Sequence, residues 1–154
     1  HENSGKLIIC SRFRYDMNNI HQTLTKTFGD GCAAMFFGDT LDNERSLIVD
    51  KFQDPNSDLR FFIGNPSVGG RGLTLTAANT VVYYSNDFNL DTRIQSEDRC
   101  HRIGQKNSVT YIDLISENTI DERIVKSLVN KINLSAKVLG EEVKEWLNIK
   151  SKKG

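Results

Sequence analysis

Short apolar runs alternate with segments of helical periodicity along this chain, and this alternation restricts the fold more than any other feature of the sequence. Strands are predicted at residues 6–10, 32–37, 59–63, 80–84 and 108–115. Helices are expected between them, and the first carries apolar residues at helical spacing, namely Met17, Ile20, Leu24 and Phe28. Because parallel strands need long crossover connections, the sequence predicts an α/β fold with a mostly parallel central sheet.

The C-terminal part of the chain has a helical pattern that weakens before the end. Thr119 and Glu122 are spaced as a capping box, which predicts a helix lined by Ile120, Ile124, Leu128 and Ile132. Residues 141–149 have the pattern of a further amphipathic helix. We therefore expect three parts: a tag or linker remnant at 1–5, a main α/β domain at 6–132, and a helical extension with a tail at 133–154.

Charge and cysteine content limit the classes of function. The 154 residues include 20 basic and 20 acidic side chains, so any nucleic-acid binding must depend on locally placed groups. Cys10, Cys32 and Cys100 contain no C-x-x-C pair, which argues against a disulfide framework or a zinc site. No apolar run approaches the roughly 20 residues that span a bilayer. We expect an intracellular, monomeric protein that is not secreted, in the cytoplasm of a prokaryote or virus-infected cell or in a eukaryotic nucleus.

Polar and glycine-rich loops follow the predicted strands, at the sheet edge where ligands of such folds bind. The loop at 64–74 contains Gly64, Gly69, Gly70 and Gly72 but no lysine followed by a hydroxyl residue, so it is not a Walker A loop. It has two interpretations that the residues alone leave open. One is a tight turn that needs glycine, and the other is a loop whose bare backbone amides approach a phosphate or a sugar.

The stretch from Gln95 to Gln105 concentrates charge in an unusual way. If it is helical up to about Ile103, one face carries Gln95, Asp98, Arg99 and Arg102. Such a face is poor core material, but guanidinium groups bind two phosphate oxygens at once, so it is suited to a polyphosphate. The alternative is a solvated face whose charges pair with each other.

Together these segments resemble the second RecA-like lobe of superfamily-two helicases, specifically Swi/Snf-type DNA-dependent ATPases. Gln95 to Gln105 is similar to motif VI of that family, which ends in Asp-Arg-x-His-Arg-Ile-Gly-Gln. Residues 69–80 are similar to motif V, and Lys6 to Phe13 is similar to motif IV. The resemblance covers about residues 6–130 and implies a RecA-like three-layer α/β/α sandwich, with residues 6–132 as the helicase C-terminal lobe.

The resemblance also implies roles for individual residues. Arg99 and Arg102 are expected to be arginine fingers for the γ-phosphoryl group of ATP, with Gln95 and Asp98 orienting them. The resemblance places Gly70, Gly72 and Thr74 at the nucleotide. It implies a DNA-backbone track formed by Ser11, Arg12, Gly38, Thr40, Asn65 and Pro66. No metal ligand is expected here, because ATP and Mg²⁺ would be bound mainly by the first lobe.

The implied function is that of an ATP-driven DNA translocase or helicase, with DNA and the first lobe of the same chain as partners. This lobe alone is expected to be inactive, because the Walker A lysine and the Mg²⁺-binding carboxylates belong to the first lobe. One alternative is an ATPase that acts on branched or partly single-stranded DNA. Another is a non-catalytic module that binds nucleic acid or protein and reuses the fold.

Overall fold

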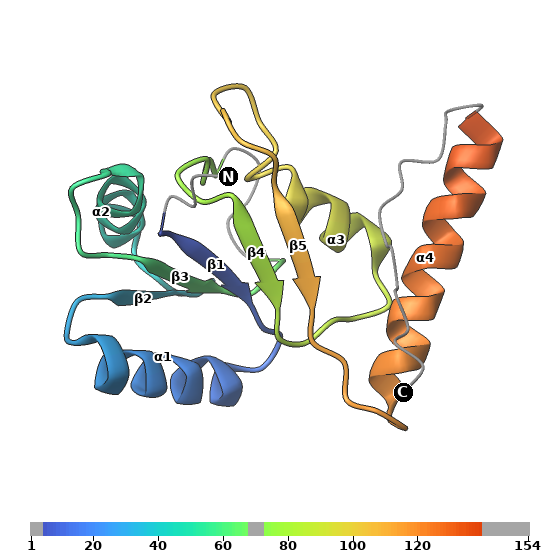
Figure 1. The fold of residues 1–154 in the computed structure, drawn as a ribbon, viewed down its shortest axis with the longest axis horizontal. Coiled ribbons are helices and arrows are strands. Elements are labelled where there is room, and N and C mark those ends of the chain that lie inside the picture. The colour runs from blue at the N-terminus through green and yellow to red at the C-terminus, as the bar shows by residue number, and fades with distance from the viewer. Residues whose placement is uncertain (1–4, 68–72, 140–154) are drawn as a thin grey trace.

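The computed structural model describes residues 5–67 and 73–139, which form the strands and helices of Figure 1. The strands are β1 (Leu7–Cys10), β2 (Ala33–Phe36), β3 (Phe61–Gly64), β4 (Thr80–Tyr83) and β5 (Thr110–Asp113). The helices are α1 (Arg14–Phe28), α2 (Asp42–Gln53), α3 (Leu90–Glu97) and α4 (Ile120–Leu139). Each strand overlaps a segment predicted from its apolar run. The predicted strand at 108–115 is shortened at both ends.

The strands form one parallel sheet in the order β2-β3-β1-β4-β5. Cys10, at the end of the central strand β1, lies opposite Gly64 on one side and Tyr83 on the other. Tyr83 in turn lies opposite Asp113 of β5. The carboxyl ends of neighbouring strands are therefore aligned, and the loops that follow them meet at one edge of the sheet.

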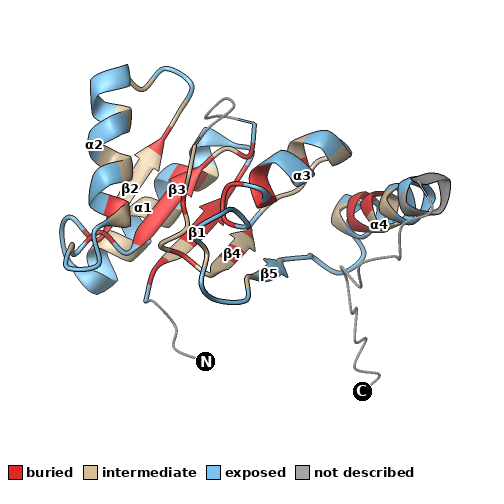
Figure 2. Cartoon of the chain, turned by 90° about the horizontal axis from the view of Figure 1, so that it is seen from above, coloured by how far each residue is buried: buried red, intermediate tan, exposed pale blue. Residues whose placement is uncertain are grey.

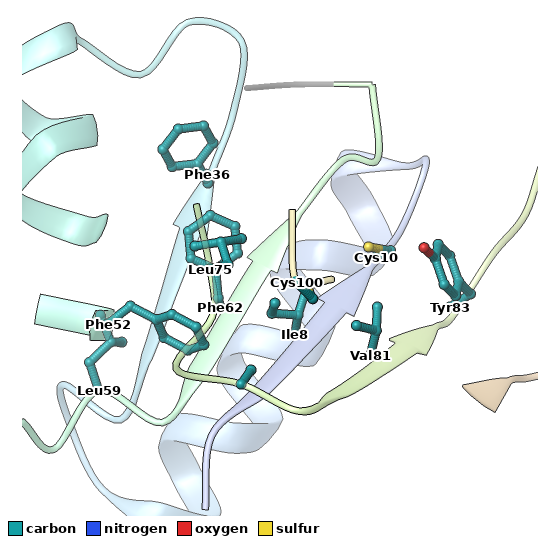
Figure 3. Close-up of a cluster of buried hydrophobic side chains, with 11 residues drawn as sticks. Ile8, Cys10, Phe36, Phe52, Leu59, Phe62, Leu75, Val81, Tyr83 and Cys100 are labelled. Atoms are coloured by element: carbon teal, nitrogen blue, oxygen red, sulfur yellow. The ribbon is translucent and has the colours of Figure 1, made fainter. Parts of the chain in front are cut away.

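Hydrophobic clusters lie on both faces of the sheet, which confirms the predicted α/β sandwich. Along β1, Ile8 belongs to the cluster that includes Phe52 of α2, whereas Ile9 belongs to the cluster that includes Met17 of α1. Successive strand residues point to opposite faces, so this apolar run supplies both. The first cluster is shown in Figure 3 and comprises Ile8, Cys10, Phe36, Phe52, Leu59, Phe62, Leu75, Ala78, Val81, Tyr83 and Cys100.

Helix α4 lies beyond β5 and contacts α3 at that end of the molecule (Figures 1 and 2). Its buried side is formed by Ile124, Val125 and Leu128. Lys131 also donates to the carbonyl of Phe88 at 2.7 Å, which ties α4 to the loop before α3. The helix continues to Leu139 and so crosses the boundary expected between residues 132 and 133. The helix expected at 141–149 lies outside the described residues.

Helix α3 is shorter than the sequence predicts, because it ends at Glu97 and not near Ile103. A longer helix would need the carbonyl of Arg99 to accept from the amide of Ile103. That carbonyl instead accepts from the amide of Leu75 at 2.9 Å. A contact between distant parts of the chain therefore uses the carbonyl that a helix extended to Ile103 would need. Among the described residues, no helix is both long and apolar enough to cross a membrane.

Candidate functional site

Three loops at the carboxyl edge of the sheet are hydrogen-bonded into one unit. The side-chain amide of Asn65, after β3, donates to the carbonyl of Arg12, after β1, at 3.1 Å. The amide of Arg12 donates to Ser85 Oγ, after β4, at 2.9 Å. The side chain of Arg12 is exposed and lies 3.9 Å from Asp87, a surface pair of small energetic value. Arg12 and Asn65 are thus neighbours at this edge of the sheet.

Two residues expected to contact DNA are buried at this edge. Ser11 is 0% exposed, and its hydroxyl oxygen lies 3.2 Å from Ser85 Oγ. Pro66 is buried as well. Neither side chain is exposed in this structure, and the contact of these two residues with DNA stays a prediction. Ser11 links the ends of β1 and β4, and the accessible part of the predicted track is Arg12, Gly38, Thr40 and Asn65.

The loop after β2 is fixed by hydrogen bonds from Arg45 of α2. The guanidinium of Arg45 donates to the carbonyl of Thr40 at 2.8 Å and to that of Gly38 at 2.6 Å. Thr40 Oγ1 accepts from the amide of Phe37 at 2.9 Å. Within the described part of the chain this hydroxyl donates to no other group, so its hydrogen is available to an acceptor. The sequence alone gives no sign of this role, because Arg45 lies on a helix and its partners lie on the preceding loop.

The arginine-bearing segment 98–105 lies along the residues that follow the glycine-rich loop. Arg102 is exposed, and its Nη1 donates to Thr74 Oγ1 at 3.0 Å. The carbonyl of Arg99 accepts from the amide of Leu75, as described above. The structure therefore brings together three residues that the sequence assigned to one site, namely Thr74, Arg99 and Arg102.

Gln105 is the last residue of this segment, and its side chain binds the residues after the glycine-rich loop. Gly104 adopts a φ of 106°, a conformation that favours glycine and turns the chain back. The side-chain amide of Gln105 then donates to the carbonyls of Thr76 and Ala78 at 3.2 and 2.9 Å. Gln53 of α2 accepts from the amide of Ala77 at 2.8 Å. Two glutamines thus fix residues 76–78, and sequence reasoning had assigned no role to either.

Arg99 is buried at the carboxyl edge of the sheet. It is 9% exposed and lines a small cavity with Gly64, Asn65 and Leu75. Its guanidinium has no hydrogen bond or ion pair within residues 5–67 and 73–139. Burial lowers the pKa of Arg99, because removal from water destabilises the cation. A bound anion would offset this cost.

The predicted single face of Gln95, Asp98, Arg99 and Arg102 does not form. Gln95 and Asp98 are exposed, whereas Arg99 is buried. The reason is the early end of α3, since the turn after Glu97 breaks the helical spacing. Gly70 and Gly72, which were expected at the nucleotide, lie outside the described residues.

Comparison with known proteins shows the family of this chain. Residues 1–104 match the family described as the helicase conserved C-terminal domain.

The chain belongs to this family.

The helicase C-terminal domain is 38% identical over 102 residues to the transcription regulatory protein SNF2 of Saccharomyces cerevisiae. The aligned residues cover 66% of this chain and 6% of that protein. It is 39% identical over 102 residues to the mouse SWI/SNF-related matrix-associated actin-dependent regulator of chromatin subfamily A member 1, covering 66% of this chain and 10% of that protein. The domain thus spans at most 10% of the length of these curated relatives.

A solved structure, described as the C-terminal part of the Fun30 ATPase domain, superposes on the helicase C-terminal domain with a TM-score of 0.72 and 32% identity. The match covers 80% of this chain and 38% of that one. Together with the sequence relatives, it confirms the resemblance to the C-terminal RecA-like lobe of Swi/Snf-type proteins and the RecA-like fold class.

Proposed function

We propose that this domain is the second motor lobe of an ATP-dependent DNA translocase of the Swi/Snf type. The observation that carries the proposal is the buried guanidinium of Arg99, which has no partner among the described residues and belongs to the same turn as the exposed Arg102, three residues further on. A guanidinium stays charged and binds phosphate oxygens in pairs, so this arrangement suits a polyphosphate brought by a neighbouring domain. The similar Fun30 structure is part of an ATPase domain, which supports ATP as that polyphosphate.

In this proposal Arg99 and Arg102 stabilise the charge that develops on the γ-phosphoryl group of ATP. An arginine in this role can raise the rate by about 10³-fold or more. Gln95 and Asp98, which are exposed next to this turn, orient the arginines and contact the first lobe. Thr74, with Gly70 and Gly72, contacts the sugar and phosphate region of the nucleotide.

ATP and Mg²⁺ are bound mainly by the first lobe in this proposal. Mg²⁺ held there would neutralise part of the charge on the phosphates. Among the described residues, no three His, Cys, Asp or Glu side chains are grouped so that they could hold a metal ion. In this proposal the domain supplies the cationic part of the site, namely Arg99 and Arg102.

The proposed DNA track consists of Arg12, Gly38, Thr40 and Asn65. Arg12 offers positive charge at an exposed position, and Thr40 offers a hydroxyl donor on a loop fixed by Arg45. Donors of this kind hold phosphates without reading the base sequence. The name of the mouse relative, a regulator of chromatin, supports DNA as the partner and favours a nuclear over a prokaryotic location.

ATP turnover by a chain that contains both lobes tests this function, with duplex, forked and single-stranded DNA compared. We expect DNA to stimulate turnover, duplex DNA most strongly, and this domain alone to be inactive because it lacks the first-lobe groups. Stimulation only by forked or single-stranded DNA would favour an ATPase that acts on branched or partly single-stranded DNA. No turnover under any condition would contradict the motor role and support a non-catalytic module.

A further inference from the structure

Arg93 of α3 lies in a buried ionic cluster at the carboxyl ends of β4 and β5. It is 8% exposed, and its guanidinium donates to both carboxylate oxygens of Asp113, at 2.5 and 3.1 Å. Its Nε donates to Glu97, one helical turn further on. Its Cζ atom lies 3.5 Å from the centre of the Tyr83 ring. One arginine therefore contacts two strand ends and the last turn of α3.

The same turn is fixed by a second set of buried contacts. Tyr83 Oη and Ser96 Oγ lie 2.6 Å apart, and Ser96 Oγ donates to the carbonyl of Arg93 at 2.7 Å. Tyr83 and Asp113 are themselves neighbours across β4 and β5. Figure 3 shows the Tyr83 side chain projecting from the end of β4. Removing one member of such a buried polar group is costly, because it leaves its partners unsatisfied.

Glu97 connects this cluster to the turn that carries the arginines. Its side chain accepts from Arg93, while its carbonyl accepts from the amides of Cys100 and His101, both at 3.0 Å. Arg99 lies within the turn so formed, and Arg102 follows it. The position of Glu97 therefore sets where this turn begins, and Arg93 sets the position of Glu97.

We propose that Arg93 is a positioning residue for ATP hydrolysis, which holds Glu97 and Asp113 together and so fixes the turn that presents Arg99 and Arg102. This inference rests on the proposed function, because a fixed turn affects the rate only if these arginines act on a phosphate. A displacement of about 1 Å in a catalytic group can lower a rate by about 10²-fold. Arg93 itself is not assigned to ATP, because its guanidinium already donates to Glu97, Asn86 and Asp113.

The test uses the chain with both lobes and the variant Arg93→Lys. Lysine keeps the positive charge but has a single ammonium group, which cannot bridge Asp113 and Glu97 with the fork that arginine provides. We expect kcat to fall by about 10-fold or more with KM for ATP changed by less than about 2-fold, the pattern of a defect in the transition state. The matched control is Arg60→Lys, the same substitution at an exposed arginine just before β3. Like Arg93, Arg60 lies against an aromatic ring, with its Cζ 5.5 Å from the centre of Phe61.

Hydrogen exchange separates positioning from a general loss of stability. In Arg93→Lys we expect faster amide exchange in residues 98–105 and unchanged exchange in α1. Charge exchange provides a rescue: Arg93→Asp with Asp113→Arg restores the ion pair, so the double variant is expected to exceed the kcat of Arg93→Asp by about 10-fold or more. A double variant no more active than Arg93→Asp, although folded, would contradict the role of the pair.

The two proposals fail in different ways. If Arg93→Lys leaves both the exchange of residues 98–105 and kcat as in the parent, Arg93 is not a positioning residue, whatever the melting temperature. If the exchange of residues 98–105 rises while kcat stays unchanged, the turn is loosened without consequence. That result would instead contradict the finger assignment of Arg99 and Arg102, and with it the proposed function.

Discussion

Arg102 donates to the hydroxyl of Thr74 at 3.0 Å, although 28 residues separate them in the chain. The neighbouring residues are joined in the same way, since the amide of Leu75 binds the carbonyl of Arg99. The arginine turn and the segment after the glycine-rich loop therefore form one surface. A nucleotide that reaches this surface would contact both.

Thr74→Val tests the value of this contact. Valine keeps the shape of threonine but cannot accept from Arg102, so the exposed guanidinium loses one anchor. A single hydrogen bond of this kind contributes about 0.5–1.5 kcal/mol, so we expect kcat of the two-lobe chain to fall by about 2- to 10-fold. The control is Thr23→Val on the exposed side of α1. Equal kcat values for both variants would show that the contact does not hold Arg102 in its active position.

Arg45→Gln tests the loop of the proposed DNA track. Glutamine is shorter and cannot reach the carbonyls of Gly38 and Thr40 together, so the loop loses its support. We expect the concentration of DNA needed for half-maximal ATP turnover to rise several-fold, while turnover without DNA stays the same. Arg123→Gln on α4 is the control, because Arg123 is exposed. An unchanged DNA requirement would remove this loop from the track.

The fold was predictable because its signals are local. The apolar run of β1 supplies both faces of the sheet, and Gly29, with a φ of 95°, ends α1 directly after Phe28, the last of its regularly spaced apolar residues. Periodicity and glycine act within a few residues, so they can be read from the chain directly.

The end of α3 and the burial of Ser11 were not predictable in this way. The carbonyl of Arg99 binds the amide of Leu75 and not that of Ile103, and the distance between Arg99 and Leu75 in sequence hides this contact. Ser11 is buried because Ser85 of a neighbouring strand end satisfies its hydroxyl. Both depend on which strands are neighbours. Arg93 was missed for the same reason, since its partner Asp113 lies on β5.

Glu97→Gln tests the electrostatics of the buried cluster. Burial raises the pKa of Glu97 to about 7, and Asp113 and Asp98 add to the rise, although Arg93 opposes it. The folded protein therefore keeps this proton at pH values where the unfolded chain, with a pKa near 4.5, has lost it. The contribution of Glu97 to stability is then highest below about pH 4.5 and falls as the pH rises to about 7.

Glutamine cannot ionise but still accepts from Arg93. We expect Glu97→Gln to be more stable than the parent above neutral pH, with the difference disappearing in acid. Urea denaturation of the domain across this range measures it, with Glu117→Gln as an exposed control. A stability difference that does not change with pH would contradict the raised pKa.

Lys6→Met tests a buried contact just before β1, at the end of the strand opposite the candidate site. Lys6 is 5% exposed and donates to the carbonyls of Phe52 and Asp54, at 2.7 and 2.6 Å, where α2 ends. Methionine fills similar space but leaves these carbonyls without their donor. We expect the free energy of unfolding to fall by about 1–3 kcal/mol, against little change for the exposed Lys26→Met. A loss no larger than that of the control would show that the contact is energetically neutral.

The central claim is that the arginines of this domain act on ATP held by another lobe. Its most direct test is single-turnover ATP hydrolysis by Arg102→Ala in the chain with both lobes, alongside ATP binding at equilibrium. We predict that binding stays within a few-fold of the parent while hydrolysis falls by about 10³-fold. Hydrolysis that survives within a few-fold of the parent would contradict the claim.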